Sequence, residues 1–249
     1  MTSELTTLTS LLSKPTESRS IPWEQDAVDR FTRRMLDQDN LFPCVFGVDA
    51  VRRETLRYTF VPRDSAVSSL AAAMTEFVAQ APSLGKRTSL VAFFQPEEEA
   101  GTYEGYRRRF WQILQDLHNV DTEPWPEGIS TDTEDPEWEF CFAGMPMFVV
   151  ANTPAHERRA SRYFESLAIT FQPRFVFDDL AEDSAQGKNA RKIIRARLSD
   201  YDTLPPTPLL GSFGAPGNRE WTQYFLDDDN ASHAAEGRCP FTQSTKGME

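Results

Sequence analysis

Apolar side chains recur every three or four residues in several parts of the chain, a spacing that predicts amphipathic helices. In the first such stretch, Trp23, Ala27, Phe31 and Met35 form one stripe of a helix expected over residues 24–38. Further helices are expected at residues 64–78, 102–117, 156–164, 185–199 and 221–225.

In other segments apolar and polar residues alternate, which is typical of β-strands with one buried face. Leu56, Tyr58 and Phe60 alternate with polar neighbours. Together with the short apolar run 44–48, they predict a hairpin that turns near residues 52–54. The remaining strands are expected at residues 89–94, 138–142, 148–151 and 167–171, the middle two forming a second hairpin.

This mixture of elements predicts an α+β fold, with a mostly antiparallel sheet of short strands and hairpins flanked by helices. The chain shows no internal repeat and no interdomain linker, so we expect a single domain over residues 21–249. Residues 1–20 are rich in Ser and Thr and lack strong periodicity, and we expect them to form a flexible leader.

Charge and composition narrow the class of protein. The chain has 249 residues, with 38 acidic and 26 basic side chains and a formal net charge of −12, so its surface repels nucleic-acid backbones. No apolar run approaches the roughly 20 residues that span a bilayer, and the N-terminus lacks the character of a signal peptide. We therefore expect a cytoplasmic protein without nucleic-acid or membrane partners. An exposed patch of its many aromatic residues would suit a homodimer.

Cys44 is the first residue with candidate chemistry. It follows Pro43 and begins an apolar segment that contains Phe46 and Gly47. One interpretation is a buried and chemically silent thiol, since free cysteines are commonly buried. The other is a thiolate ligand, because backbone N–H groups of Phe46 and Gly47 could bond the sulfur and Gly47 would let a flat cofactor approach the backbone. Spacing alone does not decide between the two.

Positive charge is concentrated in the segment 156–162, where Arg159 and Arg162 are three residues apart and share a face of the expected helix. Such a run is commonly a solvated face. In an acidic protein it could also hold carboxylates, such as porphyrin propionates or the carboxylate of an amino acid. Arg174 adds to this positive zone.

Residues 121–139 contain eight acidic side chains and no basic one, together with three prolines, and so predict an extended loop. A loop of this kind commonly serves to solubilise the surface. The functional alternative is recognition of an ammonium or guanidinium group, for which we select Glu139.

Several of these segments together resemble the YqcI/YcgG family, which is also described by its Phe-Pro-Cys motif. Their order along the chain is that of the family. The segments that carry the resemblance are Leu41–Gly47, Leu56–Val61, Phe140–Phe148, the Arg159/Arg162 pair, Phe171–Leu180 and Cys239-Pro240-Phe241. The chain departs from the pattern at Gln172-Pro173-Arg174, where many relatives carry Asn-x-His, and at Asn152-Thr153-Pro154, where some have His-Pro.

The resemblance implies a haem-dependent N-oxygenase, because characterised relatives hydroxylate arginine or guanidine nitrogens in natural-product pathways. It implies a b-type haem, dioxygen, an electron donor and an amine or guanidine substrate of the arginine type. Cys44 would then be the thiolate ligand of the iron, and His156 the proton source and the rival axial ligand. The other residues expected at the site are Phe46, Gly47, Tyr58 and Phe148 in the pocket wall, Arg159, Arg162 and Arg174 on carboxylates, and Glu139 on the substrate.

A second hypothesis is a haem-binding sensor or carrier without turnover. Its basis is the dipeptide Cys239-Pro240, which resembles the Cys-Pro of regulatory haem sites.

Overall fold

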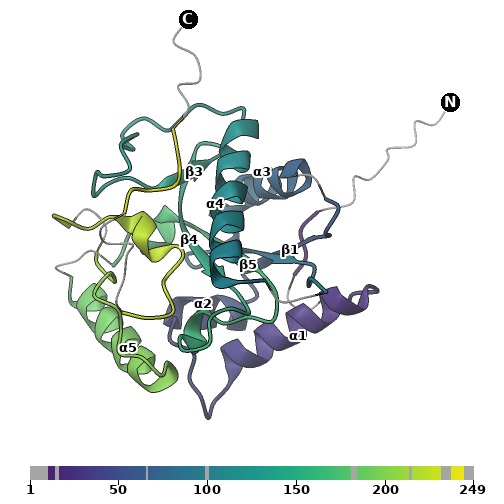
Figure 1. Cartoon of the computed structure of the whole chain (residues 1–249), viewed down its shortest axis with the longest axis horizontal. Coiled ribbons are helices and arrows are strands. Elements are labelled where there is room, and N and C mark those ends of the chain that lie inside the picture. Colours follow the sequence, from purple (N-terminus) through teal and green to yellow (C-terminus); the bar gives the residue numbers. More distant parts are fainter. Residues whose placement is uncertain are drawn as a thin grey trace, which may run out of the picture.

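A five-stranded sheet forms the centre of the protein (Figure 1). The computed structural model describes residues 11–14, 17–65, 67–98, 101–180, 184–212, 215–230 and 237–243. Its strands are β1 (Arg57–Val61), β2 (Leu90–Phe94), β3 (Phe140–Phe142), β4 (Met145–Asn152) and β5 (Ala168–Pro173). They lie in the order β1-β2-β5-β4-β3. Only β1 and β2 are parallel, so the mostly antiparallel α+β domain expected from the sequence is confirmed.

Helices cover both faces of this sheet. The α-helices are α1 (Pro22–Leu36), α2 (Val45–Arg52), α3 (Val67–Leu84), α4 (Tyr103–Val120) and α5 (Ala185–Tyr201). Three short 3-10 helices are η1 (Ala160–Arg162), η2 (Arg174–Phe177) and η3 (Glu220–Gln223). In Figure 1, α2 lies between α1 and α5, below the strands.

Strand alternation sends side chains to two different environments. Met147 and Val149 of β4, with Ile169 and Phe171 of β5, pack against α3 and α4 in the larger hydrophobic core. A smaller core joins α1 and α2 to the opposite face of β1 and β2. Successive side chains of a strand point to opposite faces of the sheet, so β4 and β5 also present side chains on this second face. There they border a cavity and are not covered by the smaller core.

The second hairpin is confirmed. Strands β3 and β4 pair antiparallel through a two-residue turn at Ala143 and Gly144. Both residues have positive φ, 50° and 72°, which is the backbone that a tight type I′ hairpin requires. Glycine adopts it without steric cost and Ala143 does not.

The first predicted hairpin is wrong. Residues 45–52 form the helix α2, and β1 pairs in parallel with β2 rather than with a preceding strand. A short apolar run does not distinguish a strand from a buried helix. Here the run begins after Cys44, whose side chain accepts a hydrogen bond from the backbone N–H of Gly47 and so caps the helix.

The segment 156–164 is not the predicted α-helix. Its regular part is the single turn η1, and the preceding backbone is held by a distant carboxylate. Asp228 accepts hydrogen bonds from the backbone N–H groups of Glu157, Arg158 and Arg159, at 2.7–3.0 Å. This tertiary contact stabilises a loop in place of helical hydrogen bonds.

Part of the expected leader contacts the domain. Ser13 exchanges two backbone hydrogen bonds with Tyr58 of β1, at 2.8 and 2.9 Å, and Leu12 is buried. Residues 1–10, 15 and 16 lie outside the described residues.

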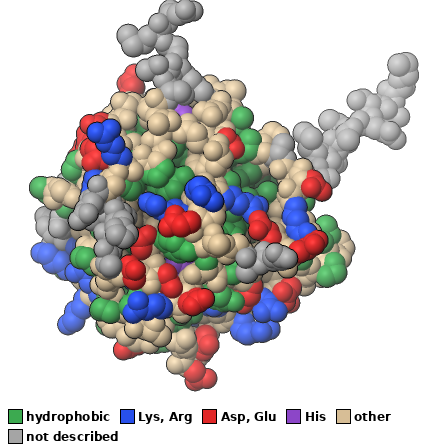
Figure 2. Space-filling model, in the orientation of Figure 1, with side chains coloured by type: hydrophobic (Ala, Val, Ile, Leu, Met, Phe, Trp, Pro, Cys, Tyr) green, Lys and Arg blue, Asp and Glu red, His purple; other side chains and the backbone are tan. Residues whose placement is uncertain are grey.

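The surface mixes acidic and basic side chains on the face that Figure 2 shows. Among the described residues, the exposed large hydrophobic side chains are all aliphatic: Leu11, Ile21, Leu41, Val120 and Ile193. No helix in the described part of the chain has both the length and the apolar character needed to cross a membrane.

Candidate active site

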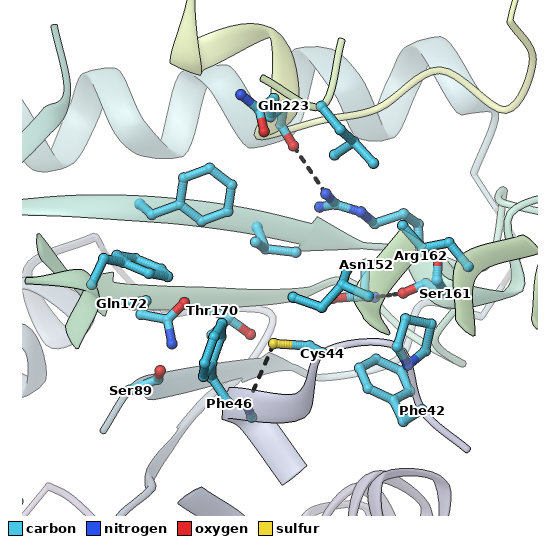
Figure 3. Close-up of a pocket in the computed structure, with 18 of the residues that line it drawn as sticks. Phe42, Cys44, Phe46, Ser89, Asn152, Ser161, Arg162, Thr170, Gln172 and Gln223 are labelled. Atoms are coloured by element: carbon cyan, nitrogen blue, oxygen red, sulfur yellow. Dashed lines mark hydrogen bonds between the residues drawn. The ribbon is translucent and has the colours of Figure 1, made fainter. Parts of the chain in front are cut away.

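A cavity of about 520 Å³ lies between the second face of the sheet and the helices α2 and α5. Its volume falls within the roughly 300–1,000 Å³ of small-molecule and cofactor sites. The sheet contributes the outward residues of β4 and β5, among them Phe148, Asn152, Thr170 and Gln172. We call it the Cys44 cavity, because Cys44 enters it from the start of α2 and lies near the centre of the lining residues in Figure 3.

Cys44 occupies the N-cap of α2. Its sulfur accepts a hydrogen bond from the backbone N–H of Gly47 at 3.4 Å. Burial raises the pKa of the thiol, whereas the N–H groups of Gly47 and Phe46 and the charge of Arg162 lower it. The net direction is upward, so the unbound side chain favours the thiol. A bound metal cation would favour the thiolate, because a coordinating thiol is deprotonated, and the positive end of the helix would also favour it.

Gly47 lines the cavity, but its missing side chain makes room for a protein atom. A Cβ at this position would lie 2.8 Å from the Cε atom of Met35 and 3.5 Å from the Cys44 sulfur. The close approach expected here for a flat cofactor is thus made by Met35 of α1.

Arg162 is the buried cation of the cavity with unused hydrogen-bonding capacity. Its residue is 8% exposed, and its Nη2 donates to the Gln223 carbonyl at 3.2 Å, as Figure 3 shows. Its Nη1 is buried and has no hydrogen-bond partner. Burial, then repulsion from Arg159, lowers the pKa of Arg162 to about 10. At neutral pH the cavity therefore holds a buried guanidinium that an anionic ligand group would satisfy.

Arg174 also lines the cavity, but two carboxylates engage it. Its Nε donates to Glu139 Oε2 at 2.6 Å, and its Nη2 donates to Glu220 Oε2 at 2.7 Å. Glu139 is fully buried and is absent from the described lining residues, whereas Glu220 belongs to them. The structure thus places Glu139, expected on a substrate cation, against the guanidinium of Arg174 and outside the cavity lining.

Aromatic side chains make up much of the remaining wall. Phe46 and Phe148, both expected there from the sequence, each pack edge-to-face against Phe177 of η2. Tyr58, also expected, is instead fully buried among Phe31 and Phe93 in the smaller core. A wall of this kind excludes water from a bound ligand.

His156 and Arg159 lie outside the Cys44 cavity. His156 is fully buried: its Nε2 donates to the Leu226 carbonyl at 2.9 Å and its Nδ1 lies 2.8 Å from the Thr153 hydroxyl. Burial lowers its pKa to about 4. The guanidinium of Arg159 donates to the carbonyls of Asp227 and Asp229. Neither side chain is placed to supply protons or bind carboxylates in this cavity.

Cys239 is also remote from the cavity. It packs, half-buried, against the larger hydrophobic core, and burial raises the pKa of its thiol to about 12. None of the residues of the acidic loop 121–139 lines the Cys44 cavity either. Among the described residues, no cluster of three or more His, Cys, Asp or Glu side chains is arranged to hold a metal ion.

Sequence reasoning missed several residues of the cavity. Arg34 of α1, Glu220 and Gln223 of η3 and Ser161 of η1 all line it. They come from segments far apart in the sequence, and no local pattern connects them. Asn152 and Gln172 carried a signal, since both lie where the chain departs from the family pattern.

The donor set fits a haem as the bound group. The thiol at the N-terminus of α2 is a suitable ligand for the iron, and the aromatic wall suits the apolar macrocycle. The buried guanidinium, one nitrogen of which has no hydrogen-bond partner, suits a propionate.

The chain is similar to known proteins over most of its length. The YqcI/YcgG family model matches residues 31–242. The proteins YcgG and YqcI of Bacillus subtilis are 41% and 40% identical, each over 88% of this chain and 88% and 87% of their own lengths.

A third relative carries a more specific name. "Putative N(omega)-hydroxy-L-arginine synthase DcsA" of Streptomyces lavendulae is 35% identical, over 88% of this chain and 84% of its own length. No solved structure matches the chain. From these similarities it follows that the chain belongs to the YqcI/YcgG family.

Proposed function

We propose that this protein is a haem-dependent N-oxygenase that hydroxylates a guanidine or amine nitrogen of an amino-acid-like substrate with dioxygen, with an arginine-type substrate favoured. The observation that carries the proposal is the similarity to DcsA, which is named as a putative N(omega)-hydroxy-L-arginine synthase. The Cys44 cavity supplies a site of suitable size and chemistry.

Cys44 is the residue that would hold the iron. Haem iron with a thiolate ligand supplies the activation of dioxygen. Pro43 precedes Cys44, and the Gly47 N–H group bonds its sulfur, so the side chain is positioned before any ligand enters. The same hydrogen bond would partly neutralise the negative charge of a thiolate.

Arg162 would bind a carboxylate, either a propionate of the haem or the carboxylate of the substrate. Its free Nη1 and its burial make it the best placed of the arginines expected at the site. Arg174 is engaged by two glutamates and Arg159 lies elsewhere. A charge-assisted bond in a dry cavity is stronger than one in water, which favours a fixed orientation of the bound molecule.

The overall reaction needs partners beyond the substrate. Conversion of one N–H to N–OH by dioxygen, with release of one water, consumes two electrons and two protons. The electrons require a donor, and the protons require an ionisable group or ordered water at the cavity. The aromatic wall would keep bulk water away from the reacting nitrogen.

The sensor hypothesis gains no support from the geometry. Its candidate ligand, Cys239, packs on the core outside the Cys44 cavity.

The test is product formation under labelled oxygen. The protein is loaded with hemin and supplied with L-arginine, a chemical reductant and ¹⁸O₂, and products are identified by mass spectrometry. We expect hydroxyarginine with one labelled oxygen atom. Tight stoichiometric haem binding without any oxidised product, from arginine or from a panel of amines and guanidines, would contradict the proposal and favour a carrier.

A further inference from the structure

Two buried carboxylates share one guanidinium beside the Cys44 cavity. Glu139 and Glu220 are 0% and 4% exposed, and Arg174 forms ion pairs with both. If all three groups were ionised, this cluster would carry a net charge of −1 away from bulk water. Burial of an uncompensated charge is unfavourable, so the cluster favours the binding of one proton.

Glu220 is the member of the pair that the cavity reaches. It belongs to η3 and lines the Cys44 cavity, whereas Glu139 lies behind Arg174. Burial raises the pKa of Glu220 to about 7, and the charge of Arg174 opposes the rise.

The hydroxyl of Tyr224 fits both protonation states of Glu220. It accepts a hydrogen bond from the backbone N–H of Phe140 at 3.1 Å, and it lies 3.1 Å from Glu220 Oε1 and 3.1 Å from the Met147 carbonyl. When Glu220 is ionised, Tyr224 can donate its proton to the carboxylate. When Glu220 is protonated, Tyr224 can donate to the Met147 carbonyl and accept from the acid, so no hydrogen bond is lost.

Glu139 does not line the cavity, and the other titratable groups near Glu220 do not supply a second exchangeable proton. Tyr224 and Cys141 both have their pKa raised, chiefly by burial. His156 lies outside the cavity, and burial lowers its pKa to about 4, so it is neutral at pH 7.

We propose that Glu220 is the proton-exchanging group of the Cys44 cavity, with Arg174, Glu139 and Tyr224 as its positioning residues. The inference rests on the proposed function, which consumes two protons in the cavity for each oxygen atom transferred. In each exchange the O–H bond of Glu220 breaks, the proton passes to a basic atom of the bound molecule, and the carboxylate that remains pairs with Arg174. Water that enters the cavity then returns a proton to Glu220, so the same carboxyl group can supply both protons in turn.

Infrared spectroscopy of the full chain without added haem tests the protonation directly. A protonated carboxylic acid has a C=O stretching band that an ionised carboxylate lacks. We expect such a band at about pH 6, lost around pH 7 and absent at about pH 9. The isosteric variant Glu220→Gln should lack it. Asp202→Asn is the matched control, because Asp202 is another carboxyl group whose pKa is raised by burial, but it is bound to Ser161.

Glu139→Gln provides a second and independent arm. It removes one negative charge from the cluster, so Glu220 should titrate about one unit or more lower in pH. A band that persists in Glu220→Gln, or no shift in Glu139→Gln, would overturn the proposal. These results do not depend on haem binding, so they are distinguishable from a failure of the proposed function.

Activity then shows whether the proton is used. In the haem-loaded protein, Glu220→Gln should form less product for each dioxygen consumed, and its pH profile should lose the step near pH 7. An unchanged product yield and an unchanged pH profile in a variant that lacks the infrared band would also contradict the role of Glu220.

Discussion

Replacing Arg162 by Met tests whether this guanidinium is reserved for a ligand. Burial lowers the pKa of Arg162 from 12.5 to about 10, and a shift of this size corresponds to about 3 kcal/mol against the charged form. The substitution also removes the hydrogen bond to the Gln223 carbonyl, at a cost of about 1.5–3 kcal/mol for a charged donor. The penalty for the buried charge thus equals or exceeds the loss of the hydrogen bond. We therefore expect Arg162→Met to leave the free energy of unfolding unchanged or to raise it by up to about 2 kcal/mol.

Arg159→Met is the matched control. Arg159 is also a buried arginine, 2% exposed, but its guanidinium donates to the carbonyls of Asp227 and Asp229 and to the side chain of Asn230. Its removal leaves these buried acceptors without a donor, and we expect a loss of about 3–5 kcal/mol.

Urea unfolding at neutral pH, followed by tryptophan fluorescence in protein without added ligand, measures both changes. We expect the midpoint to stay or rise for Arg162→Met and to fall strongly for Arg159→Met, with similar slopes. Addition of hemin or arginine should raise the free energy of unfolding of the native protein by more than it raises that of the Arg162→Met variant. A loss above about 2 kcal/mol in Arg162→Met would show instead that the guanidinium is already well satisfied in the protein without ligand.

Two further predictions concern packing and pH. Gly47→Ala replaces a glycine inside α2, which favours the helix by up to about 1 kcal/mol, but the new Cβ would lie 2.8 Å from Met35 Cε and oppose this gain. In a Met35→Ala background the same substitution should therefore be more stabilising than in the native protein, measured as a double-mutant cycle, and equal effects in both backgrounds would contradict the contact. Burial lowers the pKa of His156 to about 4 in the folded state, whereas its pKa in the unfolded chain is about 6.5. The free energy of unfolding should therefore be highest above pH 6.5 and should decrease by up to about 3 kcal/mol as the pH falls toward 4. His156→Gln should flatten this acid limb of the urea midpoint against pH, and an unchanged limb would rule out the role of His156.

The fold could be predicted where a local pattern coincides with a buried face. The alternating three- and four-residue spacing of Tyr106, Phe110, Ile113 and Leu117 predicts α4, and it is confirmed. Alternation about Phe140 and Phe142 predicts the second hairpin, which is also confirmed. The predictions fail where the decisive contact comes from elsewhere. The carboxylate of Asp228, about 70 residues away, binds the backbone N–H groups of residues 157–159.

In the site, too, local features could be predicted from the sequence and contacts between distant segments could not. The Phe-Pro-Cys motif singles out Cys44, which does line the cavity, although Cys44 begins the helix α2 and not the expected strand. A run of arginines, in contrast, gives no indication of which side chains keep free donors. Arg159 and Arg174 find partners from distant segments, whereas Arg162, in the cavity wall, retains a buried nitrogen without a hydrogen-bond partner.

The ferrous–CO spectrum shows whether the sulfur of Cys44 binds haem iron in the Cys44 cavity. The haem-loaded protein and its Cys44→Ser and Cys239→Ser variants are reduced and exposed to carbon monoxide. We predict a thiolate-type Soret band in the native protein and in Cys239→Ser, and its loss in Cys44→Ser. An unmoved thiolate-type band in Cys44→Ser, or a native protein that does not bind hemin, would contradict the account.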